Sequence, residues 1–193
     1  MLWTLRALLA TGSLFVCLPL LGAAEGDEMV ENPMYAAWAG FKPGAAATVL
    51  EKTTYRGNQN PVPDEKVVTY TLVSVSPDHV VVRAVVVEQE VLGTVESAPT
   101  RHIYPAKLKK SYLAAALPDL NAKKGEDTIT FDGKPIKCQT LSGSYTKEGE
   151  TVEFKAWIND HVPGGVVKRT RTTKQKDETI TTTVTLKSYA QGK

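Results

Sequence analysis

Histidines, which serve both as metal ligands and as general bases, are few in this sequence and stand far apart. The three histidines, His79, His102 and His161, are separated by 23 and 59 residues, so local spacing places no two of them on one face of a helix or strand. Asp160 and His161 are adjacent in an expected turn, where neighbouring side chains point apart, which indicates no oriented base. The spacing therefore predicts no metal site, and we expect no cofactor.

The candidate nucleophiles are equally isolated. Cys138 shares a strand face with Ile136 and Thr140, which favours a buried thiol that packs as a small hydrophobe; a reactive thiol or an intermolecular disulfide is the alternative. The segment 142–144 lacks the Gly-x-Ser-x-Gly frame of a nucleophile elbow, and the glycines at 164–165 join two strands instead of opening a helix that could bind phosphate. These residues predict a protein that is not an enzyme.

A basic segment, 168–176, contains five Lys or Arg residues and no acidic residue. On a strand, Arg169 and Arg171 share one face, whereas Lys168 and Lys174 share the other, which divides the charge. Such a segment commonly protects a sheet edge or solvates a hairpin. The functional alternative is that these four side chains bind anionic lipid headgroups or cell-surface polymers.

The first 24 residues have the pattern of a secretory signal peptide. Arg6 precedes an apolar stretch that ends in small residues at 22–24, and breaks at 11–13 and at Pro19 argue against a membrane span, although an uncleaved anchor is the alternative. We expect residues 1–24 to be a signal peptide, residues 25–193 to form a single domain without a transmembrane segment, and the protein to be exported to the periplasm or the extracellular space.

Export and composition together narrow the partners. A formal net charge of +2 in an exported chain gives no reason to expect nucleic acid. Of the two cysteines, Cys17 falls in the expected signal peptide, so an internal disulfide is excluded from the mature domain and stability must come from its core.

Short runs of Val, Ile, Thr and aromatic residues, separated by turn residues, dominate the chain from residue 46 onward. Asp132-Gly133 is a two-residue hairpin signal, and the connections are short, as in an antiparallel sheet. We expect a mainly β fold: a single curved antiparallel sheet, or half-barrel, of about nine strands. The strands are predicted at 46–55, 66–76, 79–91, 97–104, 126–131, 134–145, 150–159, 165–174 and 178–189.

The apolar pattern differs along the predicted sheet. The strands 66–76 and 79–91 carry Val, Leu or Tyr on both faces, so we expect cover on both sides. The strand 178–189 instead alternates apolar residues with Thr, as in a sheet with one wet face. The second face of the early strands is therefore predicted to be closed by helices, by side chains or around a ligand.

Two segments, 33–41 and 105–117, are predicted to be short helices on the concave face. Asn32 is a plausible N-cap with Pro33 at the first helical position, and Met34, Trp38 and Phe41 recur with helical spacing. The segment 105–117 has a weaker apolar stripe and stops at Pro118.

The segment Trp157-Ile158-Asn159-Asp160-His161-Val162-Pro163-Gly164-Gly165, with its flanking strands, resembles the hairpin of exported bacterial proteins with the lipoprotein-carrier fold, the LolA/LolB-like half-barrel. The opening Asn32-Pro33, Trp38 and Phe41-Lys42-Pro43-Gly44 resembles that of uncharacterised exported bacterial proteins. The resemblance implies an incomplete barrel, lidded by helices, whose apolar cavity receives acyl chains.

These observations lead to one expected function and one alternative. We expect a non-catalytic cell-envelope protein that holds a hydrophobic or amphipathic ligand, such as a lipid or a lipoprotein acyl chain, between sheet and helices. The alternative is an envelope protein-interaction or scaffolding module that binds no small ligand. Trp157 either packs beneath a helix or forms a cavity rim. The candidate cavity residues are Trp38, Phe41, Tyr70, Val82, Val86 and Trp157.

Overall fold

The computed structural model describes residues 28–57, 64–90, 93–116, 122–147 and 149–192. The expected signal peptide, residues 1–24, lies outside the described residues. Within the described ranges, every helix is too short or too polar to cross a membrane.

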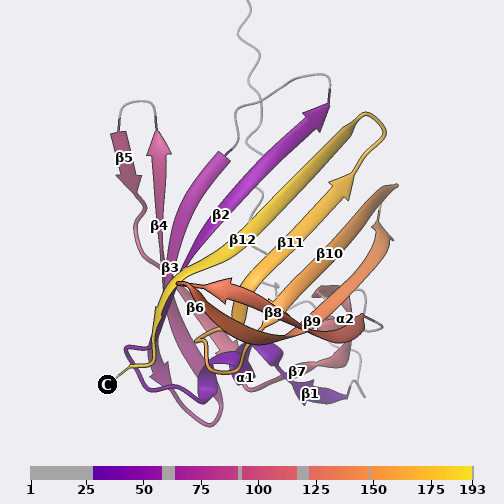
Figure 1. Cartoon of the computed structure of the whole chain (residues 1–193). Coiled ribbons are helices and arrows are strands. Elements are labelled where there is room, and N and C mark those ends of the chain that lie inside the picture. The colour runs from indigo at the N-terminus through magenta and orange to yellow at the C-terminus, as the bar shows by residue number, and fades with distance from the viewer. Residues whose placement is uncertain (1–27, 58–63, 91–92, 117–121, 148, 193) are drawn as a thin grey trace, which may run out of the picture.

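One antiparallel sheet of ten strands makes up most of the fold and stays open at both edges (Figure 1). Its order is β5-β4-β3-β2-β12-β11-β10-β9-β8, and β6 pairs with β4 beside β5. The strands are β2 (Ala46–Gly57), β3 (Asp64–Val75), β4 (His79–Glu90), β5 (Gly93–Glu96), β6 (Thr100–Pro105), β8 (Lys123–Phe131), β9 (Lys134–Lys147), β10 (Glu150–Ile158), β11 (Val166–Lys174) and β12 (Glu178–Ala190).

Most sheet neighbours are also neighbours along the chain, because short turns connect them. Asp132 and Gly133 join β8 to β9 with φ angles of 49° and 73°, the left-handed pair that a two-residue hairpin needs and that Asp-Gly supplies at low strain. The main non-local pairing is that of β12 with β2, which joins the first and last parts of the sheet. Register shifts near Leu72, Trp157 and Leu186 mark bulges, which increase local twist.

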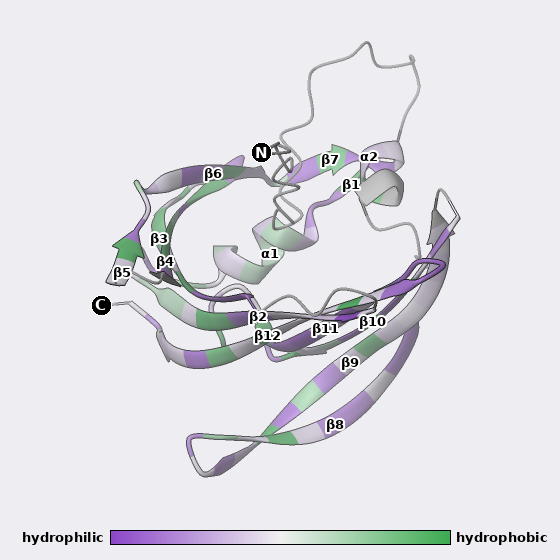
Figure 2. Ribbon diagram, turned by 90° about the horizontal axis from the view of Figure 1, so that it is seen from above, coloured by the Kyte–Doolittle hydropathy of each residue, from purple (hydrophilic) through white to green (hydrophobic). Residues whose placement is uncertain are grey.

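A short helix lies on the concave face of this sheet. Figure 2 shows α1 (Pro33–Ala39) enclosed between β6 and the strands β2, β12 and β11. A two-stranded ribbon of β1 (Met29–Glu31) and β7 (Lys107–Lys109) lies on the same side, with α2 (Lys110–Ala116) next to it.

The predicted fold class is confirmed: the protein is mainly β, with one curved antiparallel sheet and two short helices. Two boundaries differ. The strand expected at 97–104 forms as β6 only from Thr100, and the short strand β5, which precedes it, was not predicted; both pair with the edge of β4. The helix expected at 105–117 forms only from Lys110, because Lys107–Lys109 pairs with β1 instead.

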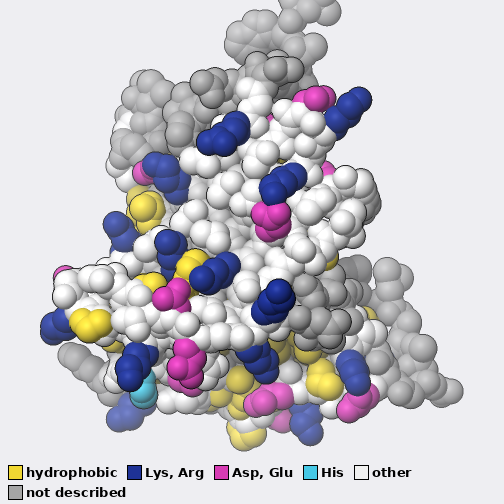
Figure 3. Space-filling model, turned by 45° about the vertical axis from the view of Figure 1, so that its right-hand side comes forward, with side chains coloured by type: hydrophobic (Ala, Val, Ile, Leu, Met, Phe, Trp, Pro, Cys, Tyr) yellow, Lys and Arg dark blue, Asp and Glu magenta, His cyan; other side chains and the backbone are white. Residues whose placement is uncertain are grey.

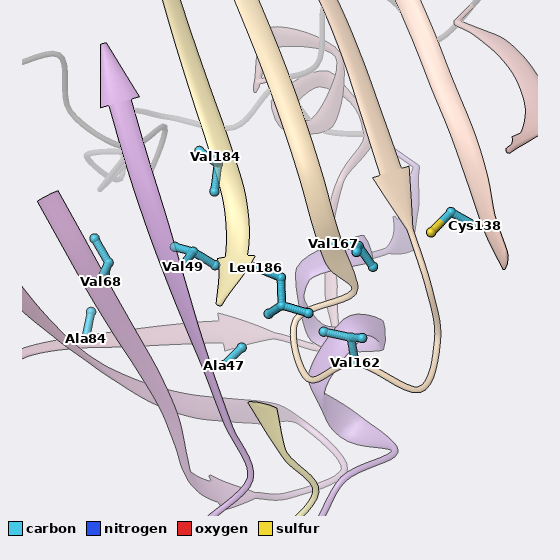
Figure 4. Packing of buried hydrophobic residues seen from close by; sticks show 9 residues of the cluster. All are labelled: Ala47, Val49, Val68, Ala84, Cys138, Val162, Val167, Val184 and Leu186. Carbon is cyan, nitrogen blue, oxygen red and sulfur yellow. The ribbon is translucent and has the colours of Figure 1, made fainter. Parts of the chain in front are cut away.

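The apolar core follows the concave face. Figure 4 shows Val49, Val68, Val184 and Leu186 from β2, β3 and β12 side by side, within a cluster that also contains Ala47. A second cluster forms around Trp38, Leu72, Val80, Val82 and Tyr104. The helix α1 therefore covers an apolar surface that the early strands expose.

Double cover of the early strands is local. Val80, Val81 and Val82 are all buried, and because successive strand residues point to opposite faces, β4 is covered on both sides there. Val73 of β3, by contrast, is 46% exposed. The prediction that both faces of the early strands are covered is thus confirmed at the start of β4. It is wrong for β3 at Val73, where one face is exposed.

Candidate functional site

The position of α1 is fixed at its first residue. The Asn32 side chain accepts a hydrogen bond from the Met34 backbone N–H (3.0 Å) and donates one to the Pro105 carbonyl (2.8 Å). The backbone N–H of Asn32 donates to the Ala106 carbonyl at 3.0 Å. One buried amide therefore caps the helix and joins it to the end of β6, so the N-cap predicted from the sequence also positions the helix.

The other end of α1 is held by the loop between β10 and β11. The Gly164 N–H donates to the Ala37 carbonyl at 3.0 Å, and Trp38, only 3% exposed, packs its indole against Gly164. A Cβ atom at Gly164 would lie 2.9 Å from Cζ2 of Trp38, closer than atoms in contact. A residue without a side chain is thus required where the loop meets the helix.

A cavity of about 130 Å³ remains between α1, this loop and the sheet. It lies above the apolar centre of the concave face, beneath the helix. Its walls come from α1, from β2, β3, β6, β11 and β12, and from the loop after β10. The lining residues are Met34, Trp38, Ala47, Val49, Glu51, Tyr70, Tyr104, Pro163, Gly164, Val166, Arg169 and Val184.

The cavity is apolar at its base and charged at its rim. Glu51 is buried and forms an ion pair with Lys66, Nζ to Oε1 at 3.2 Å. Arg169 lines the cavity yet is exposed to solvent, which places it at the opening. Burial, together with the nearby Tyr70, raises the pKa of the Tyr104 phenol far above its ordinary value, so this wall is uncharged at neutral pH.

The structure brings two of the six predicted cavity residues into this lining. Trp38 and Tyr70 line the cavity. Val82 is fully buried in the cluster around Trp38, and Phe41 packs against that cluster from the end of α1. Val86 packs against the cluster of Val49 and Val68. These three side chains are buried in or packed against the two apolar clusters and are not among the lining residues of the cavity.

Trp157 lies on the opposite face of the sheet. It pairs with Lys168, whereas its neighbour Ala156 pairs with Arg169, and directly paired residues share a face. The Trp157 indole N–H donates to Asp127 at 2.9 Å, while the ammonium groups of Lys155 and Lys168 lie 4.5 and 5.1 Å from its ring centroid. Trp157 is therefore not among the residues that line the cavity; it is half-buried against the apolar cluster that contains Cys138.

The basic segment is divided as the alternation predicts. Arg169 and Arg171 face α1, whereas Lys168 lies over Trp157 and Lys174 pairs with Glu153 at 2.5 Å on the outer face. Protection of a sheet edge is excluded, because β11 lies between β10 and β12 inside the sheet. Figure 3 shows basic and acidic side chains interspersed, with no region of a single sign on the face it displays.

Several lining residues were not predicted. The sequence predicted Met34 in the apolar stripe of the helix and Arg169 in a surface that binds anionic headgroups. Nothing in the sequence alone placed Glu51 or Tyr104 beside them. The row Glu51, Val184 and Arg169 is produced by strand pairing across β2, β12 and β11. Only knowledge of the pairing between β12 and β2 could have found it, since β2 lies far from β11 and β12 in the chain.

The other candidates for chemistry stay apart. His79 contacts Ser76 in a turn (Nδ1 to Oγ, 3.1 Å), His102 stacks on Tyr104, and His161 lies in the loop after β10. Burial lowers the pKa of His102. Cys138 is buried, and its Sγ contacts the Ile136 carbonyl at 3.7 Å. In the described part of the chain, no three His, Cys, Asp or Glu side chains converge to hold a metal ion.

No family model and no curated protein matches the sequence. Among solved structures, the chain is similar to a putative outer membrane lipoprotein-sorting protein domain from Vibrio parahaemolyticus. The alignment covers 77% of this chain and 85% of that one, with 9% identity and a TM-score of 0.25.

Proposed function

We propose that the protein is a non-catalytic cell-envelope protein that binds the apolar part of a hydrophobic or amphipathic ligand between the sheet and α1. The observation that carries this proposal is the cavity between α1 and the concave face, with an apolar base and charged groups at its opening. Pockets of this kind, largely apolar with a few polar groups that fix orientation, are the usual form of small-molecule sites.

The size of the cavity limits what it holds. A cavity of about 150 Å³ lined by apolar side chains binds a six-carbon ring, and the present one is close to that volume, at about 130 Å³. It therefore accommodates a short alkyl segment or the end of a longer acyl chain. Burying each methylene contributes about 0.8 kcal/mol, so affinity should increase with the number of methylenes that enter the cavity.

The location and partners belong to the same proposal. The signal-peptide pattern of residues 1–24 supports export to the periplasm or the extracellular space. There the ligand would be a lipid or the acyl chain of a lipoprotein. The absence of a catalytic constellation among the described side chains supports a role in binding, and we propose no cofactor and no nucleic-acid partner.

Native mass spectrometry tests the proposal. The full chain is recovered from the periplasm of an expressing host and then titrated with octanoate and 1-octanol. Binding should be weakened in Ala47→Leu, which places three carbon atoms in the cavity, and retained in Ala36→Leu, a matched change on the exposed side of α1. The proposal fails if the recovered protein carries no ligand and neither probe binds.

A scaffolding role is the second candidate, and the outer strands favour it. Val95 of β5 and Ile103 of β6 are 48% and 60% exposed, and both strands pair with β4 on one side only within the described sheet. An open edge with apolar side chains can add a strand from another protein. Capture of an envelope protein that is lost in Ile103→Lys but kept in Ala47→Leu would support this role.

A further inference from the structure

Two arginines extend along β11 from the opening of the cavity. Arg169 pairs with Val184 of β12, and both residues line the cavity. Arg171 lies two residues further along the same face, opposite Thr182, which places the two Cα atoms about 7 Å apart. Figure 2 shows β11 and β12 passing beneath α1, and since Arg169 lines the cavity, Arg171 lies on the same face of the sheet by alternation.

Among the residues that the structure describes, no acidic side chain forms an ion pair with either arginine. The ion pairs among the described residues all use lysines: Lys52, Lys66, Lys110, Lys155 and Lys174. Arg171 also has a buried Nε atom that makes no hydrogen bond. A buried donor without an acceptor is unfavourable, and a cation that lines a cavity without a counter-ion attracts a negatively charged ligand.

The nearest carboxylate in this row does not neutralise them. Glu51 lies two strands from Arg169, across Val184, and it is already paired with Lys66. Glu88, which pairs with Lys66 across β3 and β4, is exposed at the far end of the row. Arg169 thus adds a positive charge to a rim whose buried carboxylate is matched, and Arg171 adds a second charge further along β11.

On the basis of the proposed function, we propose that Arg169 and Arg171 bind the acidic headgroup of an amphiphile whose alkyl chain occupies the cavity. A guanidinium group binds carboxylate or phosphate oxygens through two parallel hydrogen bonds. The arginines lie next to the apolar base of the cavity. One ligand can therefore bind with its headgroup at the arginines and its alkyl chain beneath α1. The ligand class is therefore a carboxylate or phosphate amphiphile, in preference to a neutral or cationic one.

The test compares headgroups on one chain length. Octanoate, octyl phosphate, 1-octanol and octylammonium are titrated into the full chain by calorimetry, and inorganic phosphate is added as a separate arm. We expect the two acidic probes to bind at least ten times more tightly than 1-octanol, octylammonium to bind most weakly, and inorganic phosphate to bind weakly because it has no chain.

The matched variants lie on the same strand. Arg169→Gln with Arg171→Gln should remove the preference for acidic probes over 1-octanol, because glutamine has no positive charge. Lys168→Gln with Lys174→Gln removes the same charge from the opposite face and should retain the preference. Arg169→Lys with Arg171→Lys keeps the positive charge but loses the planar guanidinium group, so it should keep only part of the preference for acidic probes. If the double glutamine variant does not fold, this variant tests the headgroup site in its place.

The outcomes separate the two proposals. If acidic and neutral probes bind equally well, or the glutamine pair keeps the preference, the headgroup site is refuted while the cavity proposal stands. If inorganic phosphate binds as tightly as octyl phosphate, the arginines form a free-anion site and the headgroup assignment is wrong. If no probe binds, the proposed function fails and this inference fails with it.

Discussion

The indole of Trp38 lies directly against the backbone of Gly164, so that the helix α1 and the loop after β10 meet without a side chain between them. The Gly164 N–H donates to the Ala37 carbonyl at 3.0 Å, and a Cβ atom at Gly164 would lie 2.9 Å from the Trp38 ring. The two segments are more than a hundred residues apart in the chain. This contact holds the helix over the cavity and fixes one of its walls.

Gly164→Ala should therefore destabilise the protein by two effects. Gly164 has φ +78°, a conformation that costs about 1–2 kcal/mol for alanine. The clash with Trp38 adds about 1–3 kcal/mol of overpacking. Thermal and urea unfolding of the purified variant would measure the total.

Gly133→Ala is the matched control for this variant. Gly133 has φ +73°, but a Cβ atom there meets nothing within 4 Å, so only the conformational effect applies. We expect Gly164→Ala to be the less stable variant by about 1–3 kcal/mol. Equal losses in the two variants would show that the Trp38 contact contributes little.

Asp127 links stability to pH on the outer face. The hydrogen bond from the Trp157 indole, then the Thr128 backbone N–H and the nearby Lys155, lower the pKa of its carboxyl. A folded-state pKa below the unfolded value of about 3.9 means that the stabilisation is present above pH ~4 and is lost as pH falls through the folded pKa. Asp127→Asn should therefore be less stable than the parent at pH 7.

The stability gap between parent and Asp127→Asn should close in acid. Protonation of Asp127 removes the charge that the substitution removes, so the two proteins converge as pH falls below about 4. Urea unfolding of both at pH 7, 5, 4 and 3 measures the gap. A gap that is constant over this range would contradict the role assigned to the carboxylate.

How far the sequence predicts this structure depends on the range of the interaction. The Asp132-Gly133 hairpin, the Asn32 cap and the alternation of Arg169 with Lys168 follow from neighbours along the chain, and all three are confirmed. The same alternation places the side chains of Trp157 and Ala156 on opposite faces of the sheet. It does not say which of the two faces α1 covers, because that depends on the docking of Trp38 against Gly164.

The cavity was harder to predict for the same reason. Tyr70 and Trp38 could be predicted as cavity residues from the pattern of apolar residues. Glu51 and Arg169, by contrast, become neighbours of Val184 only through the pairing of β2, β12 and β11. No local signal specifies that β12 returns to β2. The polar rim of the cavity is thus a property of the topology.

Cys138 should be unreactive in the folded protein. Burial, and secondarily the negative charge of Asp127, raises the pKa of its thiol, so the reactive thiolate is scarce at pH 8. Alkylation with iodoacetamide, followed by peptide mapping that separates Cys138 from Cys17, should show slow labelling in buffer and rapid labelling in urea. Rapid labelling of the native protein, or a disulfide-linked dimer, would favour the alternatives of a reactive or pairing thiol.

The volume of the cavity predicts how affinity changes with chain length. A six-carbon ring fills an apolar cavity of about 150 Å³, so a cavity of about 130 Å³ is filled by roughly five or six carbon atoms. Each methylene that enters contributes about 0.8 kcal/mol, or nearly fourfold in affinity. For straight-chain acids from butanoate to dodecanoate, affinity should rise steeply at first and then reach a plateau near octanoate.

Ala47→Leu is the variant that locates the chain. Ala47 lines the cavity, and the larger side chain should move the plateau to shorter acids by about three carbon atoms, whereas Ala36→Leu on the exposed side of α1 should leave it unchanged. Calorimetric titration of the acid series into the three proteins measures both shifts. A constant gain per methylene up to dodecanoate, with the same slope in Ala47→Leu, would mean that the chain binds elsewhere, because the larger side chain at position 47 would occupy part of the space assigned to the chain.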